Sequence, residues 1–323
     1  MSGTWQIGDA LALSRELADA SVDCIVTSPP YWGLRSYLAD DDPGKALEMG
    51  AEPTLGEYVE RLVVLFRELR RALKPGGTCW LNLGDCYHNV RTWKGGGQIG
   101  HAFHGRKMHG QPEAASGGRA ANRATRQDGL KEKDLCLMPY RVAMALQADG
   151  WYLRSHVIWA KLNPMPESVT DRPTSAHEAV FLLTKSARYW YDADAVREAY
   201  ADDRKGQPGN YTPHKREGAG RTDGTCAPKP GGIGRNLRNV WHLATQPYSG
   251  SHYAVMPPAL VVPCIKAGCP AGGLVLDPFG GSGTVGEVAE SLGRRWLLFD
   301  LDARNEALMH KRTAQRSLLG CIR

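Results

Sequence analysis

The sequence contains no run of about 20 apolar residues, the length that a membrane-spanning helix requires. Its N-terminal segment carries Asp9, Arg15, Glu16 and Asp19, and these charges are incompatible with the apolar core of a secretory signal peptide. Both absences argue against a membrane protein or a secreted precursor. They predict a soluble, cytoplasmic protein.

Cysteine pairs at metal-binding spacing are also missing. The eight cysteines form no Cys-x-x-Cys pair, and several lie in apolar runs, as reduced cytosolic thiols do. Cys264 and Cys269 lack the second pair that would complete a zinc site. His101, His104 and His109 lack cysteine or carboxylate partners at ligand spacing. We therefore expect no metal site.

The basic residues are concentrated in two segments of the 323-residue chain, whose net charge is +6. Segment 91–133 carries nine Lys and Arg against three acids, and segment 201–239 carries eight against four. Both are rich in glycine and poor in aliphatic residues, which predicts long inserted loops. Such loops are often only solvated, but Lys and Arg also bind phosphates without regard to sequence. The two segments are therefore candidate nucleic-acid contacts.

Outside these segments, strand-like and helix-like patterns alternate, and 42% of all residues are hydrophobic, enough for one substantial core. The expected strands are 21–27, 78–83, 151–161, 179–184, 274–277 and 295–300, with 188–192 pairing back as an antiparallel hairpin. The expected helices are 57–73, 139–148, 284–292 and 257–267, the last interrupted or begun late by Pro263. The pattern predicts a single α/β domain over 1–323, with a doubly wound, mostly parallel, seven-stranded sheet.

Two short motifs carry the functional signal. The motif TSPPYW, at 27–32, follows a β-branched strand, so its loop emerges at the carboxyl end of that strand, where doubly wound sheets bind ligands. The motif LDPFGGSGT, at 276–284, places glycines between a strand and a helix, where a ligand can approach backbone N–H groups. It is not a phosphate-binding Walker loop, because Thr284 stands where such a loop needs lysine.

The two motifs together resemble motifs IV and I of the S-adenosylmethionine-dependent DNA amino-methyltransferases. The catalytic motif precedes the cofactor motif across a long polar insertion, which is similar to the permuted β class, and counterparts extend from about Gly8 to about Asp302. The resemblance implies a Rossmann-like methyltransferase sheet in a nucleoid-associated protein of bacterial, archaeal or phage origin. It further implies a catalytic half at about 1–90 and 135–199, a cofactor half at about 240–323, and target-recognition insertions at 91–134 and 200–239.

S-adenosyl-L-methionine is the cofactor that the resemblance implies. Asp277 would lie near its methionine part, and Asp9 would accept a hydrogen bond from the adenine amino group. Asp300 would accept the ribose hydroxyls, with Asp302 as a competitor and a strand-end cap as the alternative. The remaining implied cofactor residues are Pro278, Phe279, Gly280, Gly281, Gly283, Thr284, Ser251 and His252.

The Ser-Pro-Pro-Tyr loop has the chemistry that an amino-group methylation needs. An exocyclic amine is a poor nucleophile, because its lone pair is delocalised into the base. The hydroxyl of Ser28 and the carbonyl of Pro29 can accept the two amino hydrogens and direct the lone pair at a methyl donor. Pro29 and Pro30 fix the loop, and Tyr31 can stack on a base flipped out of the duplex. No catalytic His or Lys is expected, because the sulfonium is a good leaving group.

Double-stranded DNA is the expected partner. Trp32 would widen the stacking surface or pack beneath it, and loop 163–178 would bring Arg172, His177 and Glu178 to the DNA or be pinned by them. The basic candidates in the first insertion are Arg91, Lys94, Arg106, Lys107, Arg119, Arg123 and Arg126. The resemblance also permits a homodimer, and a cognate restriction endonuclease that acts on the same site without a stable complex. No membrane partner is expected.

Ser28 also bears on the target base, because serine at this position of the family is associated mainly with cytosine N4 and aspartate mainly with adenine N6. The leading hypothesis is site-specific methylation of cytosine N4 in duplex DNA after base flipping, for restriction-modification or epigenetic marking. The alternatives are adenine N6 methylation and a non-catalytic DNA-binding protein that kept the fold.

Overall fold

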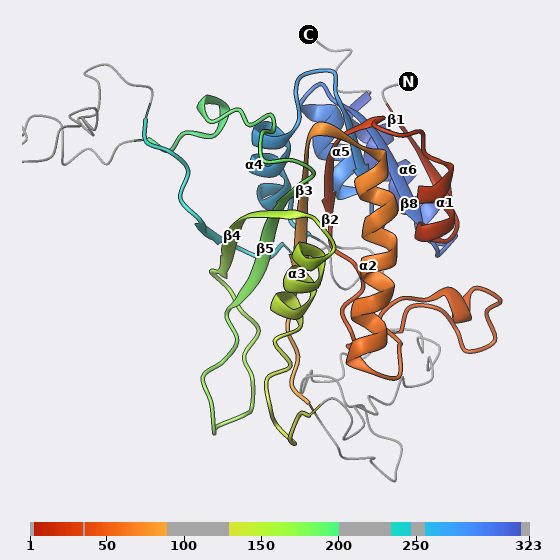
Figure 1. Cartoon of the computed structure of the whole chain (residues 1–323), viewed down its shortest axis with the longest axis vertical. Helices are drawn as coiled ribbons and strands as arrows, with labels where there is room; N and C mark the ends of the chain where they lie inside the picture. The colour runs from red at the N-terminus through yellow and green to blue at the C-terminus, as the bar shows by residue number, and fades with distance from the viewer. Residues whose placement is uncertain (1–2, 35, 89–128, 200–233, 247–255, 318–323) are drawn as a thin grey trace, which may run out of the picture.

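The computed structural model describes residues 3–34, 36–88, 129–199, 234–246 and 256–317 (Figure 1). Within them the strands are β1 (Gly3–Ile7), β2 (Val22–Thr27), β3 (Leu73–Leu83), β4 (Tyr152–Lys161), β5 (His177–Thr184), β6 (Val240–Leu243), β7 (Leu274–Asp277) and β8 (Arg295–Asp300). The helices are α1 (Ala10–Glu16), α2 (Leu55–Ala72), α3 (Met138–Ala148), α4 (Pro258–Gly268), α5 (Thr284–Ser291) and α6 (Asn305–Ser317). Two short 3₁₀ turns, η1 (Lys45–Leu47) and η3 (Asp194–Val196), complete these elements. No helix among the described residues is both long and apolar enough to span a bilayer.

All eight strands belong to one sheet, in the order β1-β8-β7-β2-β3-β5-β4-β6. Every neighbouring pair is parallel except β3–β5 and β5–β4, so β5 alone runs against its neighbours within the described part of the chain. The doubly wound α/β prediction is confirmed. The parallel strands β2, β3, β7 and β8 end at the same edge of the sheet, which is where such folds bind ligands.

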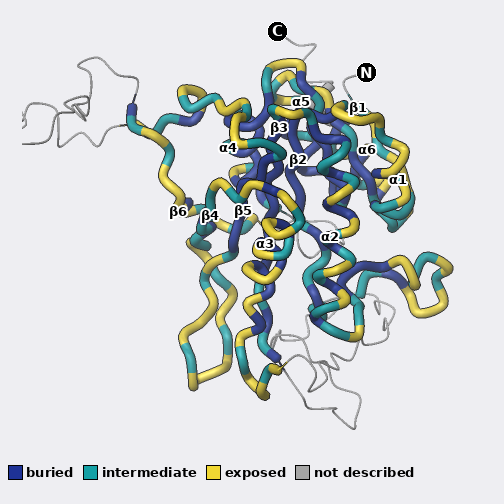
Figure 2. The backbone as a smooth tube through the Cα atoms, in the orientation of Figure 1, coloured by how far each residue is buried: buried dark blue, intermediate teal, exposed yellow. Residues whose placement is uncertain are grey.

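Helices cover both faces of the sheet. Ile25 of β2 packs into a core shared with α2 and α3, whereas Cys24 and Val26 on the opposite face pack into a core shared with α4 and α5. Because successive side chains of a strand point to opposite faces, a strand buried on both sides must be apolar throughout. The dark interior of the tube in Figure 2 follows these central strands, and exposed segments lie at the periphery.

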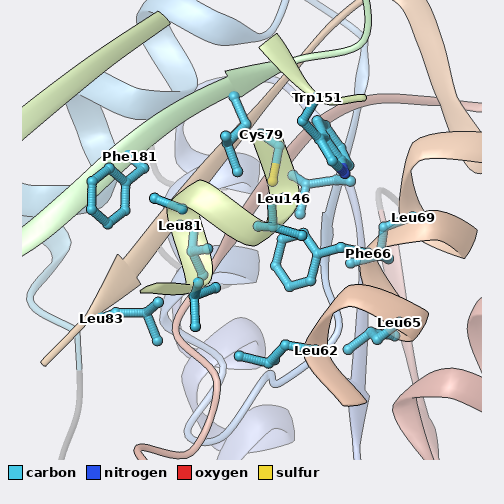
Figure 3. Close-up of a cluster of buried hydrophobic side chains, with 14 of the residues drawn as sticks. Leu62, Leu65, Phe66, Leu69, Cys79, Leu81, Leu83, Leu146, Trp151 and Phe181 are labelled. Carbon is cyan, nitrogen blue, oxygen red and sulfur yellow. The ribbon is translucent and has the colours of Figure 1, made fainter. Parts of the chain in front are cut away.

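Helix α2 begins at a capping box, in which Thr54 and Glu57 each satisfy a backbone N–H of the other. Its apolar stripe faces β3 and α3, with Leu65 and Phe66 inaccessible to solvent (Figure 3). The ring of Phe66 meets that of Trp151 edge to face, with centroids 6.2 Å apart. The helix therefore fixes β3 and the turn before β4 from one side of the sheet.

Several element predictions were wrong in detail. Segment 188–192 forms no strand. The backbone N–H groups of Trp190 and Asp192 instead donate to the carbonyls of Gly76 and Ala267. The antiparallel hairpin consists of β4 and β5. Helix α4 runs through Pro263 without a break, because its buried face, which includes Val261 and Ile265, outweighs one lost hydrogen bond. The sheet has eight strands rather than seven, since the short edge strands β1 and β6 lack the apolar run that marks a central strand.

The packing of α2 predicts a contrast between two adjacent residues. Leu65→Ala should lower the free energy of unfolding by about 2–5 kcal/mol, because it leaves a cavity in the core. Val64→Ala, at a side chain that is 38% exposed, should lower it by less than about 1 kcal/mol. Urea unfolding followed by circular dichroism measures both. Equal losses would contradict the assigned orientation of α2.

Candidate active site

A single cleft of 1530 Å³ opens along the carboxyl edge of the sheet. The predicted catalytic loop, Ser28 to Tyr31, forms part of its wall, and the predicted cofactor loop, Asp277 to Ser282, forms another part. The structure thus brings together two motifs that lie about 250 positions apart in the sequence. The cleft is the candidate active site.

The catalytic loop is held on its inner side by hydrogen bonds. The hydroxyl of Tyr58 donates to the carbonyl of Pro30 at 2.9 Å, and the Gly33 N–H donates to the carbonyl of Gly50 at 2.8 Å. Gly50 has φ +93°, and a Cβ there would lie 3.1 Å from the Tyr31 carbonyl, so glycine suits this close approach. No described residue donates to the carbonyl of Pro29. That carbonyl remains available as an acceptor, as the predicted role requires.

Tyr31 is tied into the protein by its hydroxyl. This group donates to Glu178 Oε2 at 2.7 Å, lies 3.2 Å from Asn82 Oδ1, and accepts from Ser28 Oγ at 3.3 Å. The ring packs against Gly84, where an added Cβ would lie 2.4 Å from it. Burial, and secondarily the neighbouring Glu178, raise the pKa of Tyr31 well above its ordinary value. The tyrosine is therefore a neutral hydrogen-bonding group in this site.

The structure does not support the prediction that Trp32 contacts DNA. Its side chain is 1% exposed, and its indole N–H donates to the carbonyl of Glu52 at 3.0 Å. This position is compatible with packing beneath the catalytic loop rather than with widening the stacking surface. The residue belongs to the core shared with α2.

The cofactor loop turns tightly between β7 and α5. A Cβ on Gly280 would lie 2.9 Å from Leu298 Cβ, and Gly283, with φ +83°, would place one 3.1 Å from Met309 Cα. Glycine at these positions lets the loop pack directly on β8 and α6. Gly283 caps α5 and is absent from the wall of the cleft, whereas Pro278, Phe279, Gly280, Gly281 and Thr284 all line it.

Asp277 lies at the end of β7, 3% exposed, on the floor of the cleft. Its Oδ1 accepts from Thr27 Oγ1 at 2.8 Å and from the Phe279 N–H at 3.0 Å. Its Oδ2 has no hydrogen-bond partner among the described residues. Burial, only partly opposed by these two hydrogen bonds, raises the pKa of Asp277 from 3.8 to about 7. A positively charged ligand group beside Oδ2 would offset that cost.

Asp300 holds the cofactor loop from the neighbouring strand. Its Oδ2 accepts from the Gly281 N–H at 2.7 Å, while Oδ1 accepts from the Asp302 N–H and the Asn305 amide. The pKa of Asp300 is raised by burial, against the lowering effect of these donors. A carboxylate has about four acceptor sites, so Oδ2 keeps room for a ligand hydroxyl. The competitor Asp302 lines the cleft too, but it is paired with Arg304 at 2.8 Å.

Asp9 is one of five aspartates, with 85, 277, 300 and 302, that line the cleft. Its Oδ2 caps α1 by accepting from the Ala12 N–H at 2.9 Å. A cleft with this many carboxylates suits a ligand that carries positive charge and several hydrogen-bond donors. S-adenosylmethionine has a sulfonium, an ammonium group, two ribose hydroxyls and an adenine amino group. The acceptors present therefore fit it, and the cofactor prediction agrees with their chemistry.

The candidate DNA-contact residues are distributed differently. Arg172 pairs with Glu167 at 2.5 Å and lies 3.8 Å over the ring of Tyr87, so in this conformation it pins loop 163–178. His177 lines the cleft. The described residues include none of Arg91, Lys94, Arg106, Lys107, Arg119, Arg123 and Arg126, nor the cofactor candidates Ser251 and His252. In the described ranges no three His, Cys, Asp or Glu side chains gather closely enough to hold a metal ion.

Sequence reasoning gave no catalytic role to three polar residues beside the catalytic loop. Asn82, Lys161 and Glu178 all line the cleft, and Glu178 accepts from Lys161 Nζ at 2.5 Å and from Asn82 Nδ2 at 3.2 Å. Asn82 and Lys161 lie at the carboxyl ends of the predicted strands 78–83 and 151–161. Polar residues at that edge of a predicted sheet were the signal that could have identified them.

Comparison with known proteins identifies the family. The sequence matches the DNA methylase family that covers N6 and N4 methylases, over residues 22–310. It is 39% identical to the type II methyltransferase M.SmaI of Serratia marcescens over 312 residues, which cover 96% of this chain and 90% of that protein. It is 41% identical to the type II methyltransferase M.Cfr9I of Citrobacter freundii over 296 residues, 91% of this chain and 82% of that one.

Solved structures show the same fold. PvuII DNA methyltransferase (cytosine-N4-specific) aligns with a TM-score of 0.61 at 18% identity, over 97% of this chain and 86% of its own. A putative DNA modification methylase of Thermus thermophilus, complexed with S-adenosyl-L-methionine, aligns with a TM-score of 0.56 at 19% identity, over 97% and 93%. The chain belongs to the N6/N4 DNA methylase family. It is an S-adenosylmethionine-dependent methyltransferase that acts on DNA.

The environment of Asp277 predicts a pH-dependent stability in the absence of ligand. Its pKa is higher in the folded protein, about 7, than the ordinary value of 3.8 that applies to the unfolded chain. Protonation of Asp277 therefore stabilises the folded protein. Its contribution to the free energy of unfolding is complete below about pH 4 and is lost as pH rises through about 7. Asp277→Asn, which resembles the protonated form, should gain about 2 kcal/mol relative to wild type between pH 5 and pH 8. Urea unfolding at each pH measures this, and parallel pH curves would contradict it.

Proposed function

We propose that this enzyme methylates the N4 amino group of cytosine at a specific site in duplex DNA. The observation that carries the proposal is the pair of acceptors at the tip of β2. Ser28 Oγ and the Pro29 carbonyl line the same cleft as the acidic cofactor loop, and no described residue donates to that carbonyl. Serine in the motif supports cytosine, as does the fold shared with a cytosine-N4-specific enzyme.

The acceptors act by reshaping the amine. When Ser28 and Pro29 each accept one amino hydrogen, the nitrogen is drawn from its planar geometry and its lone pair becomes available for attack. The hydrogen bond from Tyr58 to Pro30 and the buried Trp32 keep the loop in place before the base arrives. The loop therefore needs little reorganisation during the reaction.

S-adenosylmethionine, when bound, supplies a methyl group on a positively charged sulfur that leaves as a neutral thioether. Asp277, Asp300 and Asp9 are the residues that would hold it, through the acceptor atoms that face the cleft. Thr27 donates to Asp277, so the side chain immediately before the catalytic loop orients a carboxylate of the cofactor site.

The target base must leave the duplex to reach this site, because inside the duplex its amino group is engaged in base pairing and the neighbouring bases keep it from the catalytic loop. Loop 163–178, which includes His177, contributes residues to the wall of the cleft, and this supports a position beside the incoming DNA. The assignment of insertions 91–134 and 200–239 to target recognition remains a prediction, as does the division into catalytic and cofactor halves. A role in restriction-modification is supported by the type II names of the relatives.

Adenine N6 methylation is the second candidate, favoured by the breadth of the matched family. The chemistry would be the same, because adenine presents an equivalent amine beside a ring nitrogen. A folded but non-catalytic DNA-binding protein would show no methyl turnover. A cognate endonuclease and a homodimer remain predictions from the resemblance alone.

The target base is identified by its product. Incubation with labelled S-adenosylmethionine and mixed-sequence duplex DNA, followed by digestion to nucleosides and mass spectrometry, should yield N4-methylcytosine. N6-methyladenine would overturn the inference from Ser28 but keep the mechanism. Bound cofactor without any methylated base would overturn the proposed activity.

Kinetic and binding measurements should distinguish the base side of the site from the cofactor side. Ser28→Ala removes an acceptor needed only for the base, so kcat should fall about 100- to 1000-fold while the Kd for S-adenosylmethionine changes less than about threefold. Asp277→Ala should act mainly on cofactor binding, raising the Kd for S-adenosylmethionine about 10-fold or more. Single-turnover rates and calorimetric titration measure these effects. Equal losses of both quantities in either variant would contradict the division of roles.

A further inference from the structure

A serine in place of an aspartate poses a chemical problem at this site. An aspartate only accepts hydrogen bonds, but a hydroxyl carries a hydrogen of its own. The amino group that is to be methylated acts only as a hydrogen-bond donor, through its two N–H bonds. Ser28 can act as a reliable acceptor only if its own hydrogen is committed elsewhere, away from the base.

The structure commits that hydrogen to Tyr31. Ser28 Oγ and the Tyr31 hydroxyl lie 3.3 Å apart, and the Tyr31 hydroxyl lies 2.7 Å from Glu178 Oε2. A carboxylate cannot donate, and Glu178 Oε2 at 2.7 Å is a nearer acceptor than Asn82 Oδ1 at 3.2 Å, so the single hydrogen of Tyr31 is assigned to Glu178. The Tyr31 oxygen then accepts from Ser28. The two hydrogen bonds therefore run in one direction, from the cleft towards Glu178. The lone pairs of Ser28 are left facing the amine.

Glu178, the last acceptor in this series of hydrogen bonds, is held firmly in place. Glu178 accepts from Lys161 Nζ at 2.5 Å and from Asn82 Nδ2 at 3.2 Å, in addition to Tyr31. Its side chain is 15% exposed, and that of Lys161 is 22% exposed. Asn82, Lys161 and Glu178 stand on the adjacent strands β3, β4 and β5. Rigid elements thus fix the acceptor that orients the serine.

We propose that Tyr31 and Glu178 form a proton relay for Ser28, with both acting as positioning residues; this inference rests on the proposed function. When the amino nitrogen has bonded to the methyl carbon, and the carbon–sulfur pair has stayed on sulfur, the nitrogen holds one proton in excess. That proton passes to Ser28 Oγ, the serine proton passes to the Tyr31 oxygen, and the tyrosine proton passes to Glu178. The base and the hydroxyls end neutral, and Glu178 ends protonated beside Lys161.

The relay gives Tyr31 a role that its ring alone cannot fill. Tyr31→Phe keeps the ring, and with it any stacking on the base, but removes the central link. Glu178→Gln keeps the shape of the side chain and an acceptor oxygen, but its amide cannot take up a proton. If Glu178 only held the loop in place, glutamine would largely restore activity. If it receives the proton, glutamine would not.

The experiment is a double-mutant cycle on the chemical step. Single-turnover methylation of duplex DNA is measured for wild type, Tyr31→Phe, Glu178→Gln and the double variant, after the wild-type product has been identified as N4-methylcytosine. Each single variant should be about 10- to 100-fold slower, with DNA and S-adenosylmethionine affinities within about threefold of wild type. The double variant should be no slower than the slower single one, because a broken relay cannot be broken again.

Matched controls separate the relay from a folding defect. Tyr152→Phe removes another tyrosine hydroxyl at a position that is 46% exposed, at the start of β4, and should react at the wild-type rate. Cofactor titration shows that each variant is folded. A Tyr31→Phe or Glu178→Gln variant as fast as wild type, or losses that multiply in the double variant, would overturn the relay. A wild-type product other than N4-methylcytosine would instead overturn the proposed target, and the same four rates would still judge the relay.

Discussion

The hydrogen bond from Thr27 to Asp277 is the interaction on which the site depends. It is buried, 2.8 Å long, and joins the ends of the adjacent parallel strands β2 and β7. The catalytic loop starts one residue after Thr27, and the cofactor loop starts at Asp277. Because one oxygen of Asp277 is occupied in this way, the other is left towards the cleft. Together with the backbone pairing of β2 and β7, this contact holds the two loops side by side and aims a carboxylate at the cleft.

Two kinds of carboxylate serve the two ends of the cleft. On the cofactor side, Asp277 is buried and Asp300 is half-buried; both hold loop N–H groups and have raised pKa values, so they favour a ligand that brings positive charge. On the base side, Glu178 already has a cation, Lys161, and faces a tyrosine hydroxyl rather than a ligand. In the proposed mechanism the first type would bind the cofactor, whereas the second would orient Ser28. Carboxylates on the two sides of the cleft thus differ in their proposed roles because their neighbouring residues differ.

Local pattern was enough to locate the strands and helices of the buried centre. Strands β2, β7 and β8 are apolar runs that end in a residue of the candidate site, and α2 has an apolar stripe with a clear start and stop. The edge strands β1 and β6 lack such runs, since only part of each is buried. The partners of Tyr31 could not be read from the sequence, because Glu178 is 147 positions away and meets it only through the order of β3, β5 and β4. The two roles considered for Trp32 could not be separated from the sequence, because an aromatic next to a catalytic motif is equally compatible with a contact residue and with a core residue.

The central claim is that the two loops face one cleft and present a flipped cytosine to a bound methyl donor beside Ser28. The most direct measurement is a crystal structure of the enzyme with sinefungin and a cytosine-containing duplex that it methylates. The account predicts the cytosine amino group within hydrogen-bond reach of Ser28 Oγ and the Pro29 carbonyl, and about 3–3.5 Å from the donor position of the ligand. A ligand bound outside the cleft, or a flipped base whose amino group faces away from Ser28, would contradict it.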